Sequence, residues 1–128
     1  MKISRKAEYG VRAMVLLAKG KSKEAFSVRE ISNIEKVPFE FLAKIFSSLE
    51  RAKLVAAKHG ANGGYYLAKP AKAITVGSVV EALEGKITPV KCFLCSKAGK
   101  CASKDVWDKL RDSLSKTLYS IKLSDLVK

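Results

Sequence analysis

Two helical segments joined by a very short turn lie in the first half of the sequence. Ser27-Val-Arg-Glu30 has the pattern of a capping box, so a helix begins at this serine and continues to about Ile34. Pro38 suits the first position of the next helix, because its φ is fixed and its missing N–H needs no partner there. That helix carries one apolar stripe: Phe41, Leu42, Ile45, Phe46 and Leu49. Helices this close in sequence predict a helix-turn-helix.

The segment after the second helix has the pattern of a β-hairpin. Two short apolar runs between Leu54 and Leu67 flank a tip that contains Gly60, Gly63 and Gly64. In a DNA-binding helix-turn-helix, a hairpin directly after the second helix is called a wing. Its glycines permit positive φ and a close approach of the backbone to a DNA duplex. We therefore predict a mainly α fold with a small β-hairpin wing, that is, a winged helix-turn-helix.

Helices are also expected on both sides of this module. Ser4 can cap a first helix that ends at Gly20, and Thr75 can cap another that ends at Gly85. The apolar positions of the first helix recur every three or four residues: Ala7, Val11, Met14, Leu17 and Ala18.

A long C-terminal helix, capped by Ser103, has a narrow apolar seam. Its members step by three, four, four and three residues: Trp107, Leu110, Leu114, Leu118 and Ile121. Such a seam favours pairing with a second copy of the helix, and packing onto its own domain is the alternative. We predict a winged helix-turn-helix over residues 1–85, a cysteine-containing loop over 86–102, and a dimerisation helix with a partly helical tail over 103–128, all in one structural domain.

The charge balance favours a polyanionic partner. The chain has 25 Lys and Arg against 12 Asp and Glu, a formal net charge of +13. A soluble, lysine-coated surface is the alternative explanation. The longest unbroken apolar run, Ala13 to Ala18, is too short to span a bilayer, and the N-terminus lacks the apolar core of a signal peptide. We expect a cytoplasmic protein that does not act at a membrane.

Three cysteines, Cys92, Cys95 and Cys101, lie close together in a lysine-rich segment. Neighbouring cations lower the pKa of a cysteine, and the thiolate is the form that binds metals and reacts. In a reducing compartment such a group indicates metal binding or redox chemistry, and inert cysteines are the remaining alternative. We do not expect an enzyme, because the single histidine, His59, is not near any cysteine in the sequence.

The docking geometry of a winged helix assigns the DNA contacts. The N-terminal residues of the recognition helix lie over base edges, so Phe39, Glu40, Ala43 and Lys44 are expected nearest the bases. Residues at the start of the preceding helix hold phosphates, which assigns that role to Ser27 and Arg29, and His59 and Gly60 lie at the wing.

Taken in order, these segments resemble the Rrf-two (Rrf2) family of bacterial transcription regulators, and more specifically its IscR-like and NsrR-like members. The resemblance covers nearly the whole chain. It implies a homodimer that binds a pseudo-palindromic operator, with an iron–sulfur cluster of two or four irons held by three cysteines. It rests on these stretches: KAEYGVRAMVLLA, SVREIS, VPFEFLAKIFSSLERAKLV, HGANGGYYL, ITVGSVVEALEG and the cysteines ahead of a long helix.

The family pattern carries over unevenly to this sequence. The cluster cysteines map onto Cys92, Cys95 and Cys101, but the gap between the first two is shorter than usual. IscR-like members use a histidine as fourth ligand where this chain has Lys104, whereas NsrR-like members use an acid of the first helix across the dimer, which maps onto Glu8. An ion pair of Glu8 with Arg5 or Arg12 is the alternative. At the wing, His59 replaces an expected arginine.

The sequence thus predicts a homodimeric, DNA-binding transcription regulator, a repressor, controlled by a redox-, iron- or nitric-oxide-sensitive iron–sulfur cluster on the three cysteines and on Glu8 of the partner chain. The alternative is a cluster-free family member regulated by thiol oxidation or by a protein partner such as a metabolic enzyme. A third hypothesis is an architectural nucleic-acid-binding protein without an effector.

Overall fold

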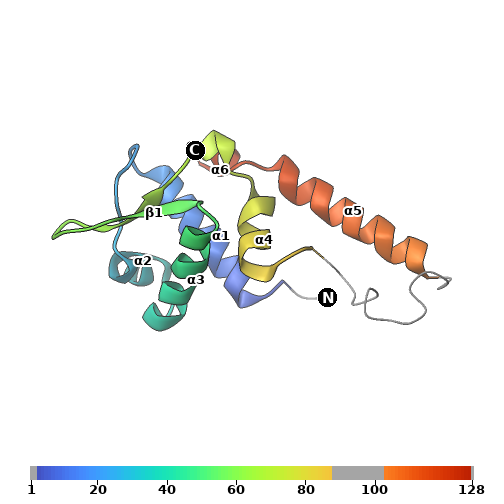
Figure 1. Ribbon diagram of the computed structural model, residues 1–128, viewed down its shortest axis with the longest axis horizontal. Helices are drawn as coiled ribbons and strands as arrows, with labels where there is room; N and C mark the ends of the chain where they lie inside the picture. Colours follow the sequence, from blue (N-terminus) through green and yellow to red (C-terminus); the bar gives the residue numbers. More distant parts are fainter. Residues whose placement is uncertain (1–2, 88–102, 128) are drawn as a thin grey trace.

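The computed structural model describes residues 3–87 and 103–127, and within them the fold is mainly helical with one small antiparallel sheet (Figure 1). This confirms the predicted fold class. The elements are α1 (Arg5–Lys19), α2 (Val28–Glu35), α3 (Phe39–Arg51), β1 (Val55–Lys58), β2 (Gly64–Leu67), the short 3-10 helix η1 (Ala71–Ala73), α4 (Val76–Glu84), α5 (Lys104–Ser120) and α6 (Leu123–Leu126).

Side-chain caps fix where three of the helices begin. The Ser4 hydroxyl accepts a hydrogen bond from the Ala7 amide at 3.1 Å, and the Thr75 hydroxyl accepts one from the Ser78 amide at 3.1 Å. At α2 the predicted capping box is present: the Ser27 hydroxyl accepts from the Glu30 amide at 3.0 Å, and the Glu30 carboxylate accepts from the Ser27 amide at 3.1 Å. These contacts satisfy amides that have no partner within the helix.

Two predicted helix starts differ from the structure. Pro38 was expected at the first helical position of α3. Its ψ of 133° is not helical, so Pro38 is the N-cap and the helix begins at Phe39. Ser103 does not cap the backbone of α5 with its side chain. Its hydroxyl instead accepts a hydrogen bond from the indole Nε1 of Trp107 at 3.2 Å.

The core lies between α1, α3 and α4, which pack side by side (Figure 1). Gly10 lets α1 approach α4 closely, since a Cβ at this position would lie 2.1 Å from the Leu83 side chain. The largest side chains with less than 2% exposure come from several elements: Phe46, Met14, Ile31, Leu42, Ile45, Leu49, Ile74 and Leu123. Helices α1 and α4, which lie outside the helix-turn-helix in the sequence, therefore pack against the buried face of α3.

The wing is joined through β2 to the segment just before α2. Strands β1 and β2 pair from Val55 with Leu67 to Lys58 with Gly64. Beyond this register, Tyr65 pairs with Phe26, just before α2, through two backbone hydrogen bonds of 2.9 and 2.8 Å. Two backbone hydrogen bonds therefore attach the wing to the segment that leads into α2.

Helix α5 extends away from the body of the molecule (Figure 1), and none of its residues is buried. After it, the chain returns to the core: the Val76 amide donates to the Ile121 carbonyl at 2.8 Å, and the Leu123 amide donates to the Ile74 carbonyl at 2.9 Å. Ile121, predicted on the helix, lies just past its end in an extended conformation. The predicted partly helical tail is confirmed as α6, and its Leu123 is fully buried.

No helix in residues 3–87 and 103–127 has the length and hydropathy needed to span a membrane.

Candidate nucleic-acid interface

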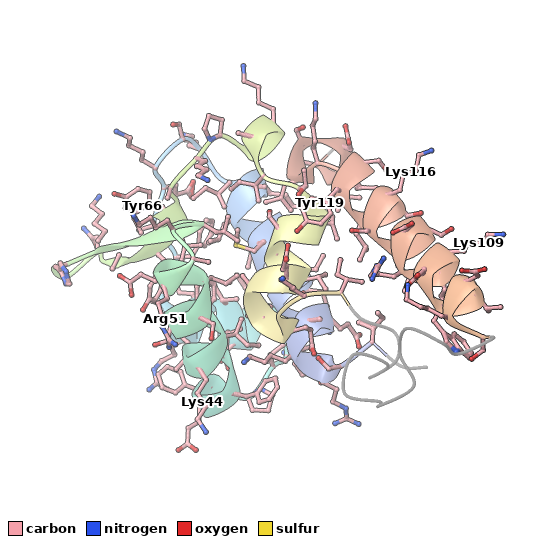
Figure 2. All side chains as sticks on the ribbon, turned by 45° about the vertical axis from the view of Figure 1, so that its right-hand side comes forward. Lys44, Arg51, Tyr66, Lys109, Lys116 and Tyr119 are labelled. Atoms are coloured by element: carbon pink, nitrogen blue, oxygen red, sulfur yellow. The ribbon has the colours of Figure 1, made fainter. Side chains whose placement is uncertain are left out.

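The exposed face of α3 is polar and charged, with the acids Glu40 and Glu50 and the bases Lys44 and Arg51. Its opposite face is buried in the core, which leaves Glu40 and Lys44 in solvent and Ala43 half-buried. Lys44 and Arg51 both project away from the body of the protein (Figure 2). A shallow depression on this face is lined by Lys6, Ala43, Lys44, Ser47, Ser48 and Arg51. Three of its six lining residues are cations, which suits contact with a phosphate backbone.

Two basic residues at the start of α1 border this face and were missed by the sequence analysis. Arg5 lines a second depression together with Glu40 and Lys44, and Lys6 lines the first. Both are brought to α3 by helix packing, since the Tyr9 ring of α1 meets the Phe41 ring edge-on with centroids 5.7 Å apart. Only the tertiary fold joins positions so far apart in sequence.

The residues at the start of α2 divide between two roles. Ser27 uses its hydroxyl as the acceptor of the helix cap. The Arg29 guanidinium lies over the ring of Phe39, 4.8 Å from its centroid. The structure thus brings together a predicted phosphate contact and a predicted base contact.

The tip of the wing is open to solvent. His59 and Gly60 are exposed, and Gly60 has a φ of 112° with no atom within 4 Å of the position of a Cβ. The tip therefore has the access that a groove contact needs.

Glu8 is the one predicted cluster ligand that the structure describes. It lies exposed near the start of α1, and the ion pairs among residues 3–87 and 103–127 do not include it. Arg12 contacts Glu35 instead, through its side chain at 3.2 Å and through the backbone carbonyl at 2.6 Å. The Glu8 carboxylate is therefore accessible to a ligand or to a second chain.

Cys92, Cys95 and Cys101 lie outside the described residues. Within 3–87 and 103–127, no three histidine, cysteine or acidic side chains are close enough together to hold a metal ion.

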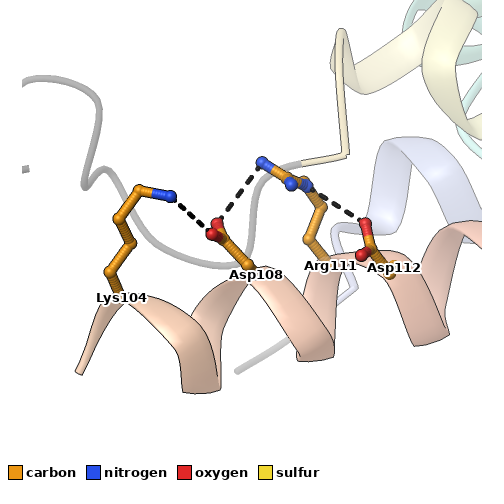
Figure 3. A network of polar contacts seen from close by, with 4 residues as sticks. All are labelled: Lys104, Asp108, Arg111 and Asp112. Carbon is orange, nitrogen blue, oxygen red and sulfur yellow. Dashed lines mark hydrogen bonds and ion pairs between the residues drawn. The ribbon is translucent and has the colours of Figure 1, made fainter. Parts of the chain in front are cut away.

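Lys104 belongs to a chain of ion pairs along α5 (Figure 3). Its ammonium lies 2.6 Å from the Asp108 carboxylate, and Arg111 lies 3.6 Å from both Asp108 and Asp112. The hydrogen bond to Asp108 raises the pKa of Lys104, and the hydrogen bond from Lys104 lowers the pKa of Asp108. Lys104 therefore stays protonated at neutral pH and has no lone pair to offer to a metal.

The predicted dimerisation residues fall into two groups. Leu118 and Ile121 pack against the chain's own Ala7, Val76 and Val80. The others lie nearer the N-terminal end of α5, each half-buried: Trp107, Leu110 and Leu114. Lys109 and Lys116 project from the side of α5 that faces away from α4 (Figure 2).

A recognition helix that exposes Lys44 and Arg51, followed by an accessible wing, defines a winged helix-turn-helix DNA-binding protein. The profile of the Rrf2 family, described as "Iron-dependent Transcriptional regulator", matches residues 3–128. The chain therefore belongs to the Rrf2 family of transcriptional regulators, which confirms the resemblance inferred from the sequence.

Two relatives and two solved structures illustrate the range of the family. The regulator CymR of Bacillus subtilis is 35% identical over 98% of this chain and 89% of its own length, and IscR of Vibrio atlanticus is 32% identical over 100% and 76%. The structure of B. subtilis CymR, described as the global cysteine regulator, has a TM-score of 0.83 at 34% identity and covers 98% of this chain and 95% of CymR. The oxidized form of Staphylococcus aureus CymR has a TM-score of 0.82 at 30% identity, with coverages of 100% and 97%.

Proposed function

We propose that this protein is a homodimeric repressor that binds a pseudo-palindromic operator, and that an iron–sulfur cluster on Cys92, Cys95 and Cys101 sets its affinity for DNA. The observation that carries the proposal is the depression lined by Lys6, Lys44 and Arg51, together with an open wing, in a chain that belongs to the Rrf2 family.

The DNA contacts follow from the chemistry of the exposed groups. Lys44 donates to guanine O6 or N7, and Glu40 accepts from cytosine N4. Ala43 and Phe39 lie within reach of a thymine methyl group. The remaining contacts go to the backbone or the minor groove: Ser27, Arg29, His59 and Gly60.

Dimerisation through α5 supplies the second recognition helix. A two-fold operator requires two copies about 34 Å apart. Trp107, Leu110 and Leu114 form an apolar strip on a helix without buried residues, which supports this role. Leu118 and Ile121 extend the strip toward the core that they already contact.

The ligand set proposed for the cluster is the three cysteine thiolates and Glu8 of the partner subunit. Thiolates suit iron–sulfur clusters, and an exposed carboxylate without an ion pair among the described residues fits a weaker fourth ligand. The protonated Lys104 does not fit that role. A bound cluster would supply a centre that responds to oxidants, iron and nitric oxide. Because the cysteines belong to the segment between the DNA-binding module and α5, loss of the cluster would act on that segment.

Reconstitution with iron and sulfide under anaerobic conditions tests the cluster. We expect a visible chromophore that is lost in Cys92→Ala, Cys95→Ala or Cys101→Ala. Glu8→Gln should keep the chromophore but lose it faster in air, while Glu84→Gln, which also changes an exposed acid, should match the wild type. A colourless wild-type protein would contradict the cluster.

A cluster-free regulator that responds to thiol oxidation is the second candidate. The similarity to CymR, whose S. aureus structure was obtained in an oxidized form, favours it. In this case the reconstituted protein stays colourless, but peroxide changes its affinity for the operator and a thiol reductant restores it. Replacing the cysteines with alanine then abolishes the response. A third outcome, in which a metabolic enzyme and not peroxide alters binding, would indicate regulation by a protein partner.

Lys44→Ala and Arg29→Ala should separate base recognition from phosphate contact. We expect Lys44→Ala to change the base preference at one position of each half-site, at a cost of about 1–3 kcal/mol for the preferred base. Arg29→Ala should weaken binding to all sequences alike. Titration of a panel of single-base operator variants measures both, and identical profiles would mean that α3 does not read the bases.

A further inference from the structure

The contact between Arg29 and Phe39 connects the two helices of the helix-turn-helix on their outer surface. Arg29 is the second residue of α2 and Phe39 is the first of α3, and the guanidinium carbon lies 4.8 Å from the centre of the ring. The Phe39 side chain is 42% exposed, whereas Phe46 in the same helix is fully buried. Packing in the core therefore does not account for an aromatic residue at position 39.

Arg29 keeps its charge available. The protein has a second arginine over a ring, Arg12, at 5.6 Å from the centre of Tyr9. Arg12 is neutralised by Glu35 at 3.2 Å, but no carboxylate forms an ion pair with Arg29 within residues 3–87 and 103–127. The two arginines thus have different partners: one ties helices together, and the other can meet an external anion.

We propose that Phe39 is a positioning residue for Arg29 and does not itself read a base. The ring holds the guanidinium at the N-terminal end of α3, where the helix would enter the major groove, so that Arg29 binds a phosphate of the DNA backbone. A guanidinium over a ring keeps N–H donors at its edges for the phosphate oxygens. This inference rests on the proposed DNA-binding function and assigns Phe39 a role different from contact with a thymine methyl group.

The two roles of Phe39 predict opposite results for Phe39→Leu. Leucine keeps an apolar side chain that can touch a methyl group, but it removes the ring that attracts the cation. If Phe39 positions Arg29, Phe39→Leu should resemble Arg29→Ala, and Phe39→Tyr, which keeps the ring, should resemble the wild type. The loss should be roughly tenfold in affinity for the dimer, since each protomer loses about a factor of three.

The test is a double-mutant cycle measured on two probes: a mixed-sequence duplex, and the preferred duplex that the wild-type protein selects from a randomised pool. We expect Phe39→Leu and Arg29→Ala to weaken binding to both probes and to reduce the dependence of affinity on salt concentration. The double variant should bind no more weakly than Arg29→Ala alone. A thermal unfolding measurement checks that each variant is folded.

Either of two results would overturn the positioning role. In the first, Phe39→Leu changes the preference for one base and leaves the salt dependence of affinity unchanged. In the second, the losses of binding free energy caused by Phe39→Leu and by Arg29→Ala add in the double variant. Failure of the proposed function has a different signature, because the wild type would then bind all duplexes equally. Even in that case, comparing how the DNA affinity of Phe39→Leu and that of Arg29→Ala depend on salt concentration decides whether the ring positions the arginine.

Discussion

Replacing Phe46 with alanine should lower the free energy of unfolding by about 4 kcal/mol. Phe46 is fully buried in α3, and its ring stacks on Tyr65 of β2 with centroids 4.8 Å apart. The substitution removes core contacts and leaves a cavity that the surrounding helices fill only in part. It also removes the support beneath the wing. Urea unfolding followed by circular dichroism measures the change.

Two control variants keep this prediction testable if the alanine variant does not fold. Phe46→Leu retains most of the volume and should cost only about 1 kcal/mol. Phe39→Ala removes the same side chain from the exposed end of the same helix and should cost less than about 1 kcal/mol. If Phe46→Ala and Phe39→Ala are equally stable, the core is not organised around Phe46 as described.

Replacing Gly64 with alanine should lower the free energy of unfolding by about 3 kcal/mol and weaken DNA binding. Gly64 has a φ of 149°, and an added Cβ would lie 2.2 Å from the Phe26 carbonyl oxygen and 2.6 Å from the Ser27 amide nitrogen. Both atoms belong to the backbone, so no side-chain rotation relieves the clash. The pairing of Tyr65 with Phe26 that attaches the wing to α2 would be disrupted.

Gly60→Ala is the matched control in the same hairpin. Gly60 also has a positive φ, 112°, but nothing lies within 4 Å of the added Cβ. We expect a cost of about 1–2 kcal/mol from the backbone conformation alone. Thermal unfolding of both variants gives the difference, and a difference near zero would show that the wing does not approach Phe26 closely. Titration of a duplex with the Gly64 variant tests the effect on DNA binding.

Local patterns were enough to predict the helices and the wing. The capping box of Ser27 and Glu30, the cap at Thr75 and the glycine-rich hairpin depend on residues a few positions apart, and the structure confirms them. Ser103 shows how such a prediction goes wrong, because a competing donor, the Trp107 indole, takes the hydroxyl that a cap would need.

Contacts between distant segments could not be predicted in this way. Arg12 was considered as a partner of Glu8 on the same helix, but the fold brings Glu35 to it from α2. The Arg29 and Phe39 contact joins two helices whose relative angle the sequence pattern does not specify. The spacing of Leu118 was compatible with a dimer seam or with packing onto its own domain, and the fold places it against α4 and α1 without testing the seam.

The attachment of residues 121–123 to residues 74–76 gives α5 a mechanical property. In the part of the chain that the structure describes, the helix joins the core through its C-terminal end, where the Val76 and Leu123 amides form their hydrogen bonds. Its 17 residues span roughly 25 Å. A displacement of about 2 Å at Lys104 therefore corresponds to a tilt of roughly 5° at the attachment. This attachment adjoins α4, so any tilt of α5 would act on the helix that packs against α1 and α3.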